Sequence, residues 1–435
     1  MRQTTRTEGL RPLPPRNGLH GARLAVLGPL NPEDLRLHAW IRPHEPILTL
    51  EATSSPHVVS CTVSKRFLWS YKVKSLAGAV ALVAAGCSKP APLRIAVVGG
   101  YGSPLGAVLA VQDVNAAGGI NGRPLELGVV EEGTLVVPQQ ALATAESLAA
   151  DPGVLAVIGH GESGTSLVAS QVYNARHVPQ IAPNTSTPLY TQAGPYSFRL
   201  VASDENQAAF MASRIGVMSP MPRIAVLYVN DDYGRALRTA LHPALQRANT
   251  AVVYEAPFLR GESFTKGVSD LARSVANARP DLLVWLGLPD ELILLRPKLR
   301  QALPRLRVLG SDAVAGVRTP ADLNWLTGDW LVSFVDLTAD RPDLRRVATR
   351  FQADNHQPLG DAAALTYDAV GILAEALRSG AVDREGIRRY LEQAAASGHV
   401  FRGITGAISF DANGDAQPAY TLLEITPEGL RPVKP

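Results

Sequence analysis

Short apolar runs recur through most of this chain, and they restrict its possible folds more than any other feature. From Leu93 onward, runs rich in Val, Ile and Leu alternate with longer stretches of helical periodicity. Such runs are typical of strands buried on both faces, so the alternation predicts parallel sheets covered by helices. The predicted strands are Arg94–Val98, Leu125–Glu131, Val154–Ile158, Gln180–Ala182, Arg223–Tyr228, Ala251–Pro257, Leu282–Leu286 and Leu306–Gly310. The predicted helices are Pro104–Ala117, Gln139–Ala150, Asn206–Met218, Tyr233–Arg247, Phe264–Ala278, Pro289–Ala302 and Tyr367–Leu377.

This pattern breaks near Ser203-Asp204 and then starts again, which predicts two similar α/β lobes with a crevice between them. Crevices of this kind commonly bind small molecules. Two further strands, Ala407–Phe410 and Tyr420–Ile425, flank a turn at Asp411–Asp415. The turn is interpreted either as a hairpin or as a hinge crossing between the lobes.

The stretch from Val154 to Pro188 places polar residues at two neighbouring strand ends. The first strand is followed by a glycine-rich turn, and Ser163 then opens a helix. Free N–H groups and the helix dipole favour an anion such as a carboxylate there. The next strand ends in Asn184-Thr185-Ser186-Thr187. In an open α/β sheet the ligand crevice lies outside these carboxyl ends.

Two enzyme readings compete with a binding site. Gly161-Glu162-Ser163-Gly164-Thr165 nearly matches the G-x-S-x-G elbow of serine hydrolases, but a threonine stands at the last position. The loop Gly99–Gly106 resembles a dinucleotide loop, yet its third glycine is one residue out of register. The plainest reading makes Ser163 an ordinary helix-capping serine. No histidine or carboxylate spacing suits zinc, and we expect neither a metal nor a cofactor.

The basic charge of the chain belongs to its first part. Residues 1–87 hold 11 basic and 5 acidic side chains, a net charge of +6, whereas residues 88–435 hold 31 and 34, a net charge of −3. The globular part therefore gives no electrostatic case for nucleic-acid binding. Both cysteines, Cys61 and Cys87, also lie in this first part.

A signal peptide is predicted at residues 73–87. Basic residues precede an apolar run, Leu76–Ala85, which is too short to span a membrane. Its ending VAAGC resembles the lipobox of bacterial lipoproteins and implies a lipid anchor on Cys87, although Ala84 stands where leucine is usual. An ordinary signal peptide is the alternative.

The 72 residues before this signal show no period of either kind. We expect them to be disordered, or to result from a start site assigned too early, with translation beginning near Val73. N-terminal sequencing of the native precursor would decide between the two. Residues 88–92 would form a short tether.

Several motifs together resemble one family. Val111-Gln112-Asp113-Val114-Asn115-Ala116-Ala117-Gly118-Gly119-Ile120-Asn121-Gly122 is similar to a signature of the periplasmic leucine/isoleucine/valine-binding proteins, the solute receptors of ABC importers. The resemblance continues through Asn230–Gly234, Leu365–Asp368 and Gly406–Asp411. It implies a type I periplasmic-binding fold, in which two doubly wound parallel-sheet lobes are joined by a three-crossing hinge. Lobe 1 would comprise 93–203 and 335–409, and lobe 2 would comprise 204–334 and 410–435.

The resemblance also implies a ligand site for an amino acid. Ser163 would hold the α-carboxylate, assisted by the hydroxyl of Ser186, and the loop at Asn184 would offer a backbone carbonyl to the ammonium. Tyr233 would close over the ligand, and Asp312 would pair with the α-ammonium, because a desolvated cation left unpaired is costly.

Two departures from the family pattern affect the ligand side chain. Leu288 stands where the leucine-type receptors have an aromatic residue, and Glu162 replaces one of a pair of cysteines. Glu162 would be unfavourable beside an anionic group unless it points outward.

The sequence therefore predicts an exported solute-binding protein that is not an enzyme. It would be a monomer, lipid-anchored at a membrane, in the periplasm or at the cell surface. It would bind a small amino acid of the branched-chain type, or a related solute, and deliver it to an ABC permease. A serine hydrolase using Ser163 and a non-transport ligand sensor of the same fold are the alternatives.

Overall fold

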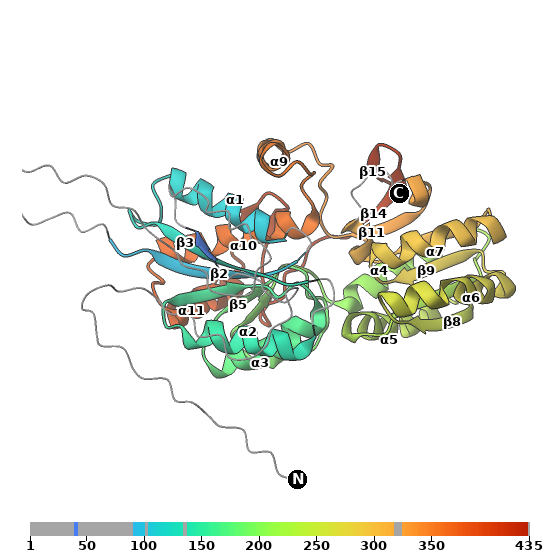
Figure 1. Cartoon of the computed structure of the whole chain (residues 1–435), viewed down its shortest axis with the longest axis horizontal. Coiled ribbons are helices and arrows are strands. Elements are labelled where there is room, and N and C mark those ends of the chain that lie inside the picture. The colour runs from blue at the N-terminus through green and yellow to red at the C-terminus, as the bar shows by residue number, and fades with distance from the viewer. Residues whose placement is uncertain (1–38, 42–89, 101–102, 134–136, 317–323, 434–435) are drawn as a thin grey trace, which may run out of the picture. The chain divides into compact units, whose positions relative to one another are not determined.

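The computed structural model describes residues 39–41, 90–100, 103–133, 137–316 and 324–433, which belong to one compact unit. The predicted signal peptide with Cys87, and all of residues 1–72 except 39–41, lie outside the described residues. Within the described ranges the chain forms two large sheets and one two-stranded sheet (Figure 1).

The first sheet has six strands among the described residues, in the order β1-β3-β2-β4-β5-β6. Every neighbouring pair from β3 to β6 is parallel, whereas β1 pairs antiparallel with β3. The strands are β1 (Ala39–Ile41), β2 (Leu93–Gly99), β3 (Leu125–Glu131), β4 (Val154–Ile158), β5 (Gln180–Ala182) and β6 (Ser197–Arg199).

Helices cover both faces of this sheet because its strands are apolar on both sides. In β2, Ile95 and Val97 pack into a core shared with α1, α10 and α11, while Ala96 and Val98 pack into a core shared with α2 and α3. Figure 1 shows α1 and α10 on one side of the sheet and α2 and α3 on the other. The helices are α1 (Ser103–Ala116), α2 (Pro138–Ala150), α3 (Ser163–Ala175), α9 (Pro342–Asn355), α10 (Asp361–Arg378) and α11 (Arg384–Ser397).

The second sheet is built in the same way. In the described residues it has the order β15-β14-β11-β10-β9-β7-β8, parallel from β11 to β8 and antiparallel at β14 and β15. The strands are β7 (Ile224–Val229), β8 (Val252–Phe258), β9 (Leu282–Leu286), β10 (Arg307–Gly310), β11 (Trp330–Ser333), β14 (Thr421–Thr426) and β15 (Gly429–Pro432).

Residues that alternate along β7 again face two cores. Ala225 and Leu227 pack with α6 and α7, and Ile224 and Val226 pack with α4 and α5. These helices are α4 (Asp204–Gly216), α5 (Asp232–Arg247), α6 (Glu262–Ala278) and α7 (Pro289–Ala302). The fold class predicted from the sequence, two doubly wound parallel-sheet lobes of the type I periplasmic-binding fold, is confirmed.

The chain passes between the sheets after β6, after β11 and after β13 (Gly406–Ile408). β13 pairs with β12 (Phe401–Gly403), whereas β14 pairs with β11 and β15. The strands on either side of Asp411–Asp415 therefore belong to different sheets, so the crossing reading holds. The turn is also a tight local hairpin, because Phe410 and Ala416 form an antiparallel bridge across it and the N–H of Asp411 donates to the Asp415 carbonyl at 2.9 Å.

One strand appears where none was expected. Ala39–Ile41, within the segment predicted to lack structure, pairs with Leu127–Val129 of β3. The reason is that β3 would otherwise leave an open sheet edge, whose unpaired backbone groups accept a passing extended segment. β1 also lies upstream of the predicted signal peptide, so removal of that peptide would return β3 to the edge.

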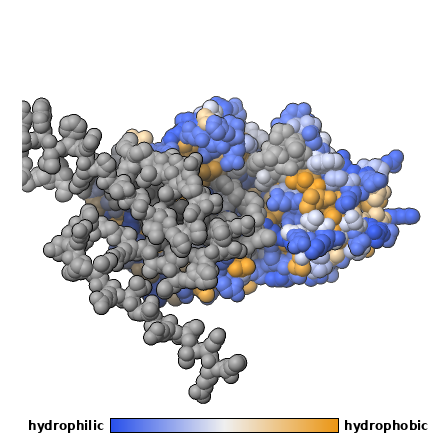
Figure 2. All heavy atoms as spheres, viewed as in Figure 1, coloured by the Kyte–Doolittle hydropathy of each residue, from blue (hydrophilic) through white to orange (hydrophobic). Residues whose placement is uncertain are grey.

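No helix in the described part of the chain is long and apolar enough to cross a membrane. On the face shown in Figure 2, hydrophilic residues make up most of the surface that is coloured, with hydrophobic residues between them. Leu259 and Leu294 are among the exposed large hydrophobic residues. Exposed residues of this kind are common on soluble domains.

Candidate functional site

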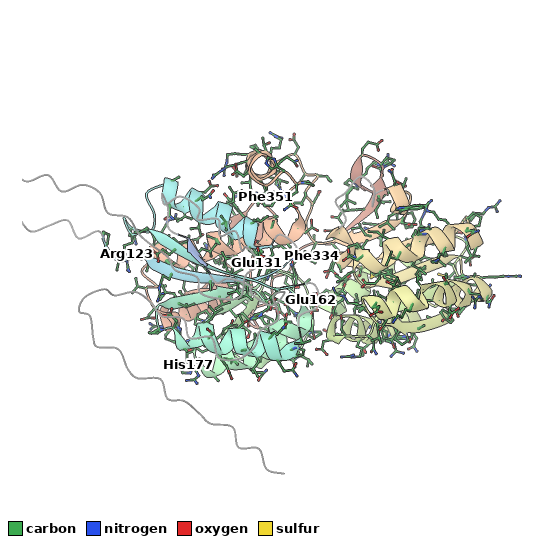
Figure 3. The ribbon with its side chains drawn as sticks, in the orientation of Figure 1. Arg123, Glu131, Glu162, His177, Phe334 and Phe351 are labelled. Carbon is green, nitrogen blue, oxygen red and sulfur yellow. The ribbon has the colours of Figure 1, made fainter. Side chains whose placement is uncertain are left out.

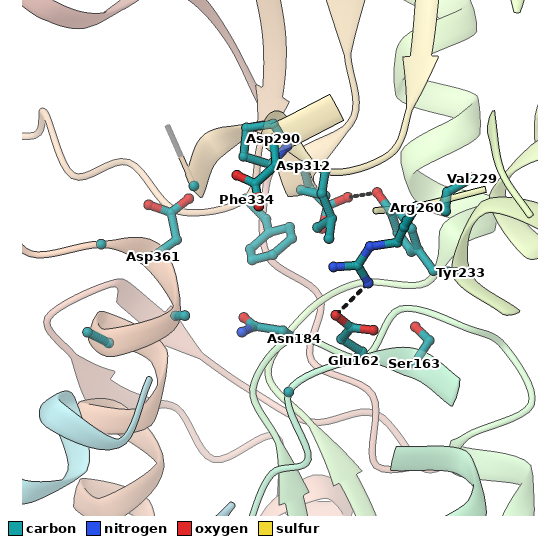
Figure 4. A pocket seen from close by; sticks show the side chains of 18 of the residues that line it. Glu162, Ser163, Asn184, Val229, Tyr233, Arg260, Asp290, Asp312, Phe334 and Asp361 are labelled. Atoms are coloured by element: carbon teal, nitrogen blue, oxygen red, sulfur yellow. Dashed lines mark hydrogen bonds and ion pairs between the residues drawn. The ribbon is translucent and has the colours of Figure 1, made fainter. Parts of the chain in front are cut away.

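A cavity of about 240 Å³ is lined by loops that follow strands of both sheets. It is larger than the roughly 150 Å³ cavity that holds one benzene molecule, so it suits a small solute. Figure 3 shows Glu162 and Phe334 where the two sheets approach each other, and Figure 4 shows the lining side chains. Those that carry the argument are Glu162, Ser163, Asn184, Tyr233, Arg260, Leu288, Asp312 and Phe334.

Ser163 lies at the start of α3 and lines this cavity. The residue is 2% exposed, and its Oγ has no hydrogen-bond partner among the described residues. The side chain of Glu162, at the N-cap position, makes no capping hydrogen bond within the described part of the structure. The first-turn N–H groups and the Ser163 hydroxyl are thus available to an anion beside the positive end of the helix.

A buried hydrogen-bond network fixes the loop that leads to Ser163. Glu132 lies 2.6 Å from Nδ1 of His160 through one oxygen, and its other oxygen accepts from the N–H of Gly161 at 3.0 Å. Burial raises the pKa of the Glu132 carboxyl, but these interactions outweigh it and hold the pKa below its usual value. His160 Nε2 contacts the hydroxyl of Tyr173 at 3.2 Å. Both ring nitrogens of His160 are therefore occupied away from Ser163.

The second polar loop, after β5, places one of its predicted site residues in the cavity and the other in the protein interior. Asn184 lines the cavity, whereas Ser186 is fully buried and is absent from the described lining. The Ser186 carbonyl accepts hydrogen bonds from Arg199 and from the N–H of Asp204, both at 2.9 Å. Arg199 also forms an ion pair of 2.6 Å with Asp415, which lies in the crossing after β13. Arg199 therefore connects this loop to that crossing.

On the second sheet, Tyr233 and Asp312 come together. The Tyr233 hydroxyl donates to Oδ1 of Asp312 at 2.6 Å, and the Gln207 amide donates to the same oxygen at 2.7 Å. Tyr233 is placed there by Asp231, which caps α5 by accepting from the N–H of Gly234 at 2.9 Å. Burial raises the pKa of the Asp312 carboxyl, although the hydrogen bonds from Tyr233 and Gln207 oppose it. A positively charged group on a ligand would balance the negative charge of the Asp312 carboxylate.

Glu162 does not point outward, as a site for an anionic group would require, but into the cavity. It forms an ion pair of 2.9 Å with Arg260, which follows β8 of the second sheet (Figure 4). Burial raises the pKa of the Glu162 carboxyl, and the positive charge of Arg260 opposes that rise. Sequence reasoning missed Arg260, whose one signal was its position two residues beyond the carboxyl end of a strand.

Asp204 was also missed. Both of its oxygens are buried and have no hydrogen-bond partner in the residues that the structure describes. Burial raises the pKa of Asp204 to about 8, while the nearby Ser186 hydroxyl, which does not reach hydrogen-bond geometry, lowers it. The negative charge of Asp312 adds to the rise. Asp204 is absent from the described cavity lining, and a pKa of about 8 keeps it mostly protonated at neutral pH.

The last glycine of the Gly99–Gly106 stretch lies in α1 and has a packing role. A Cβ on Gly106 would lie 1.8 Å from the backbone oxygen of Ala363 in α10. This glycine therefore allows α1 and α10 to pack closely. Among the described residues, no group of histidine, cysteine and acidic side chains could hold a metal ion.

Comparison with known proteins places the chain among solute receptors. A family model for periplasmic binding proteins matches residues 96–429. The chain is similar to the leucine-specific-binding protein of Salmonella typhimurium, with 27% identity over 316 residues that cover 70% of this chain and 84% of the relative. It is 29% identical to the Leu/Ile/Val-binding protein of Escherichia coli over 252 residues, 56% of this chain and 67% of the relative.

A solved structure has the same fold. The branched-chain amino acid transporter substrate-binding protein of Streptococcus pneumoniae, in complex with isoleucine, superposes with a TM-score of 0.67 at 21% identity. The match covers 79% of this chain and 100% of that chain.

Proposed function

Because the chain belongs to the periplasmic binding protein family, we propose that it is the extracytoplasmic solute-binding protein of an ABC importer. Its ligand is a small amino acid of the branched-chain type, or a related solute, bound between the two lobes. The names of the relatives from Salmonella typhimurium and Escherichia coli support an amino-acid ligand.

One observation carries this proposal. One cavity has the Ser163 hydroxyl, which has no partner among the described residues, on its first-sheet side and the half-buried Asp312 carboxylate on its second-sheet side. A zwitterion matches that arrangement, since its carboxylate suits the start of α3 and its ammonium suits an acid. The ligand's carboxylate or ammonium would bind poorly if it lost its water without gaining a partner of opposite charge or a hydrogen bond in the site.

In this proposal the site residues contact different groups of the ligand. Ser163 donates to the α-carboxylate. Ser186 is the second hydroxyl proposed for the carboxylate, and because it lies outside the described cavity lining it can assist only if the loop after β5 moves on binding. Asn184 offers its backbone carbonyl to the ammonium. Asp312 pairs with the ammonium, and Tyr233 closes over the ligand from the second lobe.

Binding favours the closed form, because a ligand held from both lobes interacts with that form more strongly than with the open one. The closed form then docks on the membrane permease. We propose that one lobe comprises residues 93–203 with 335–409 and the other comprises residues 204–334 with 410–435. The protein acts as a monomer and carries no catalytic group or cofactor.

Export depends on the segment at residues 73–87, with a lipid on Cys87 holding the protein at a membrane, in the periplasm or on the cell surface. Labelling with a radioactive fatty acid tests this directly, since wild type should take up label and Cys87→Ser should not.

The alternatives gain no specific support from the site. For a hydrolase, a base should lie beside Ser163, but His160 contacts Glu132 and Tyr173 instead. Ester hydrolysis lost on Ser163→Ala would support a hydrolase. A sensor of the same fold would use the same site, and permease genes beside this gene would argue against it.

The test is a thermal-shift screen of the purified protein against amino acids. A ligand at about 100 times its dissociation constant adds roughly 2.7 kcal/mol to the free energy of unfolding. Ser163→Ala and Asp312→Asn should abolish the shift, whereas Ser274→Ala, at an exposed serine of α6, should keep it. If no amino acid raises the melting temperature, or if all three variants respond like wild type, the proposal is wrong.

A further inference from the structure

One ion pair connects the two lobes across the cavity. The Glu162 carboxylate lies 2.9 Å from Nη1 of Arg260, and the two side chains are 30% and 11% exposed. Glu162 precedes α3 of the first lobe, whereas Arg260 follows β8 of the second, and 98 residues separate them (Figure 4). Because the two loops belong to different lobes, the pair forms only while the lobes lie close together.

A second contact between the lobes lies beside this pair. Gly164, in the first turn of α3, faces Asp232, in the first turn of α5. A Cβ on Gly164 would lie 2.9 Å from Oδ2 of Asp232. The missing side chain at position 164 therefore lets the starts of the two helices approach each other closely. The lobes thus meet at the end of the cavity where Ser163 lies.

Arg260 is positioned by its own lobe. Its Nε lies 3.8 Å from a carboxylate oxygen of Glu291 in α7, and Glu291 also accepts from the N–H of Gly261 at 3.4 Å. The charge of Asp231, at the N-cap of α5, acts on the same guanidinium. These second-lobe groups hold the guanidinium at the cavity, where Glu162 meets it when the lobes approach.

The attraction between the two side chains is partly offset. Burial raises the pKa of the Glu162 carboxyl, and the positive charge of Arg260 opposes that rise. Opening the lobes returns both groups to water, which compensates much of the attraction that is lost, so the net preference for the closed form is modest. A modest preference still allows a ligand to enter, which a strong one would prevent.

We propose that Glu162 and Arg260 form a latch that keeps a fraction of the ligand-free protein closed. Since the closed form holds the ligand most strongly, the apparent dissociation constant varies inversely with the fraction of protein that is already closed. The latch therefore sets the affinity without contacting the ligand. Its effect on affinity rests on the proposed function, whereas its effect on the separation of the lobes does not.

The separation of the lobes in the ligand-free protein is measured with two nitroxide labels. The labels are attached at exposed positions of α3 and α5, through Gln171→Cys and Thr239→Cys. The full chain is used, with its two native cysteines replaced by serine. Double electron–electron resonance then gives the distribution of distances between the labels.

Removing one charge of the latch should change this distribution. We expect Glu162→Gln to shift molecules from the short distance to a longer one. The matched control, Glu262→Gln, alters an exposed ion pair with Lys266 on α6 and should leave the distribution as it is without the substitution. The same distribution with and without Glu162→Gln would overturn the latch.

A double-mutant cycle separates the ion pair from the other interactions of Arg260. Arg260→Met should also open the lobes, and adding Glu162→Gln to it should open them no further, because the partner is already gone. Further opening in the double variant would show that Glu162 does not act through Arg260 and would overturn the latch. If Glu162→Gln alone does not fold, Arg260→Met decides: an unchanged distribution in that variant overturns the latch.

Calorimetry extends the test to affinity, with the amino acid that gives the largest thermal shift. Glu162→Gln should raise its dissociation constant about two- to tenfold, and Glu262→Gln should not. A Glu162→Gln variant that is opened and yet binds as tightly as wild type would overturn the link between the latch and affinity. If no amino acid binds, the proposed function fails, while the distance measurement still decides whether the latch exists.

Discussion

The hydroxyl of Tyr233 donates a 2.6 Å hydrogen bond to Oδ1 of Asp312, the carboxylate proposed to receive the ligand's ammonium. Tyr233 thus has a second role besides closing over the ligand, because its hydroxyl stabilises the Asp312 carboxylate and holds it in position. The hydrogen bond joins the start of α5 to the loop after β10, two segments 79 residues apart in the chain.

Tyr233→Phe should therefore weaken amino-acid binding. Hydrogen bonds to charged groups contribute about 1.5–3 kcal/mol, so the dissociation constant should rise roughly tenfold or more. Calorimetric titration measures this, with Tyr254→Phe, on β8, as the control. An equal change in both variants would show that the hydroxyl at 233 does not act through Asp312.

The buried Asp204 carboxyl should make stability depend on pH. Its pKa is about 8 in the folded protein against a usual value of 3.8. Between those values the folded protein keeps a proton that the unfolded chain has lost, so the free energy of unfolding falls as pH rises. The slope contributed by one group reaches at most about 1.4 kcal/mol per pH unit. Asp312, whose pKa is also raised, adds to the effect in the same direction.

Urea unfolding at pH 5 and pH 7.5 measures this dependence. Asp204→Asn should raise the stability at the higher pH and flatten the profile between the two. Parallel profiles for the variant and wild type would mean that Asp204 is ionised in the folded protein.

The ion pair between Arg199 and Asp415 should matter for folding. Arg199 is 1% exposed and Asp415 is 14% exposed, and their charged groups lie 2.6 Å apart. Removing one partner of a buried pair leaves an uncompensated charge and costs about 3–5 kcal/mol. Denaturant unfolding of Asp415→Ala should show such a loss. Arg431→Ala breaks an exposed pair with Glu424 and should change little, so similar losses in both variants would contradict this account.

Close packing of α1 on α10 gives a further prediction. A Cβ on Gly106 would meet the backbone of Ala363 at 1.8 Å, so Gly106→Ala should destabilise the protein by about 1–3 kcal/mol or more. A Cβ on Gly267 in α6 would meet nothing within 4 Å beyond its own stretch of helix in the described structure, and Gly267→Ala should stabilise by about 0.5–1 kcal/mol. Melting temperatures that move in the same direction for both would be inconsistent with the packing described.

Much of the fold could be predicted because burial leaves a local pattern. Leu282–Leu286 is apolar at every position, and each residue of the resulting strand β9 is buried. Predicted and observed bounds agree there and at β3, β4 and β5. By contrast, the strand β12 and the helix α11 were not predicted. β12 is only three residues long, whereas α11 buries Ile387, Leu391 and Ala394 at helical spacing, a signal that the sequence interpretation overlooked.

The site was less predictable because its contacts join distant segments. Arg260 and Glu162 are 98 residues apart and lie in different lobes, so nothing near either residue reveals the other. The sequence showed only that Glu162 would be unfavourable beside an anionic group unless it pointed outward, whereas in the structure it forms an ion pair with Arg260 of the second sheet inside the cavity. Asp204 was identified only as part of the break between the lobes, and nothing in the neighbouring sequence indicates that its carboxyl is buried.

The central claim is that one zwitterion is held by Ser163 and Asp312. Calorimetry with the amino acid that gives the largest thermal shift, compared with the same amino acid acetylated at its amine or amidated at its carboxylate, tests it most directly. The account predicts one molecule of the free amino acid bound per chain and at least about a hundredfold loss for each blocked form, since each leaves a buried charge or donor unpaired. Blocked forms that bind as tightly as the free amino acid would contradict it.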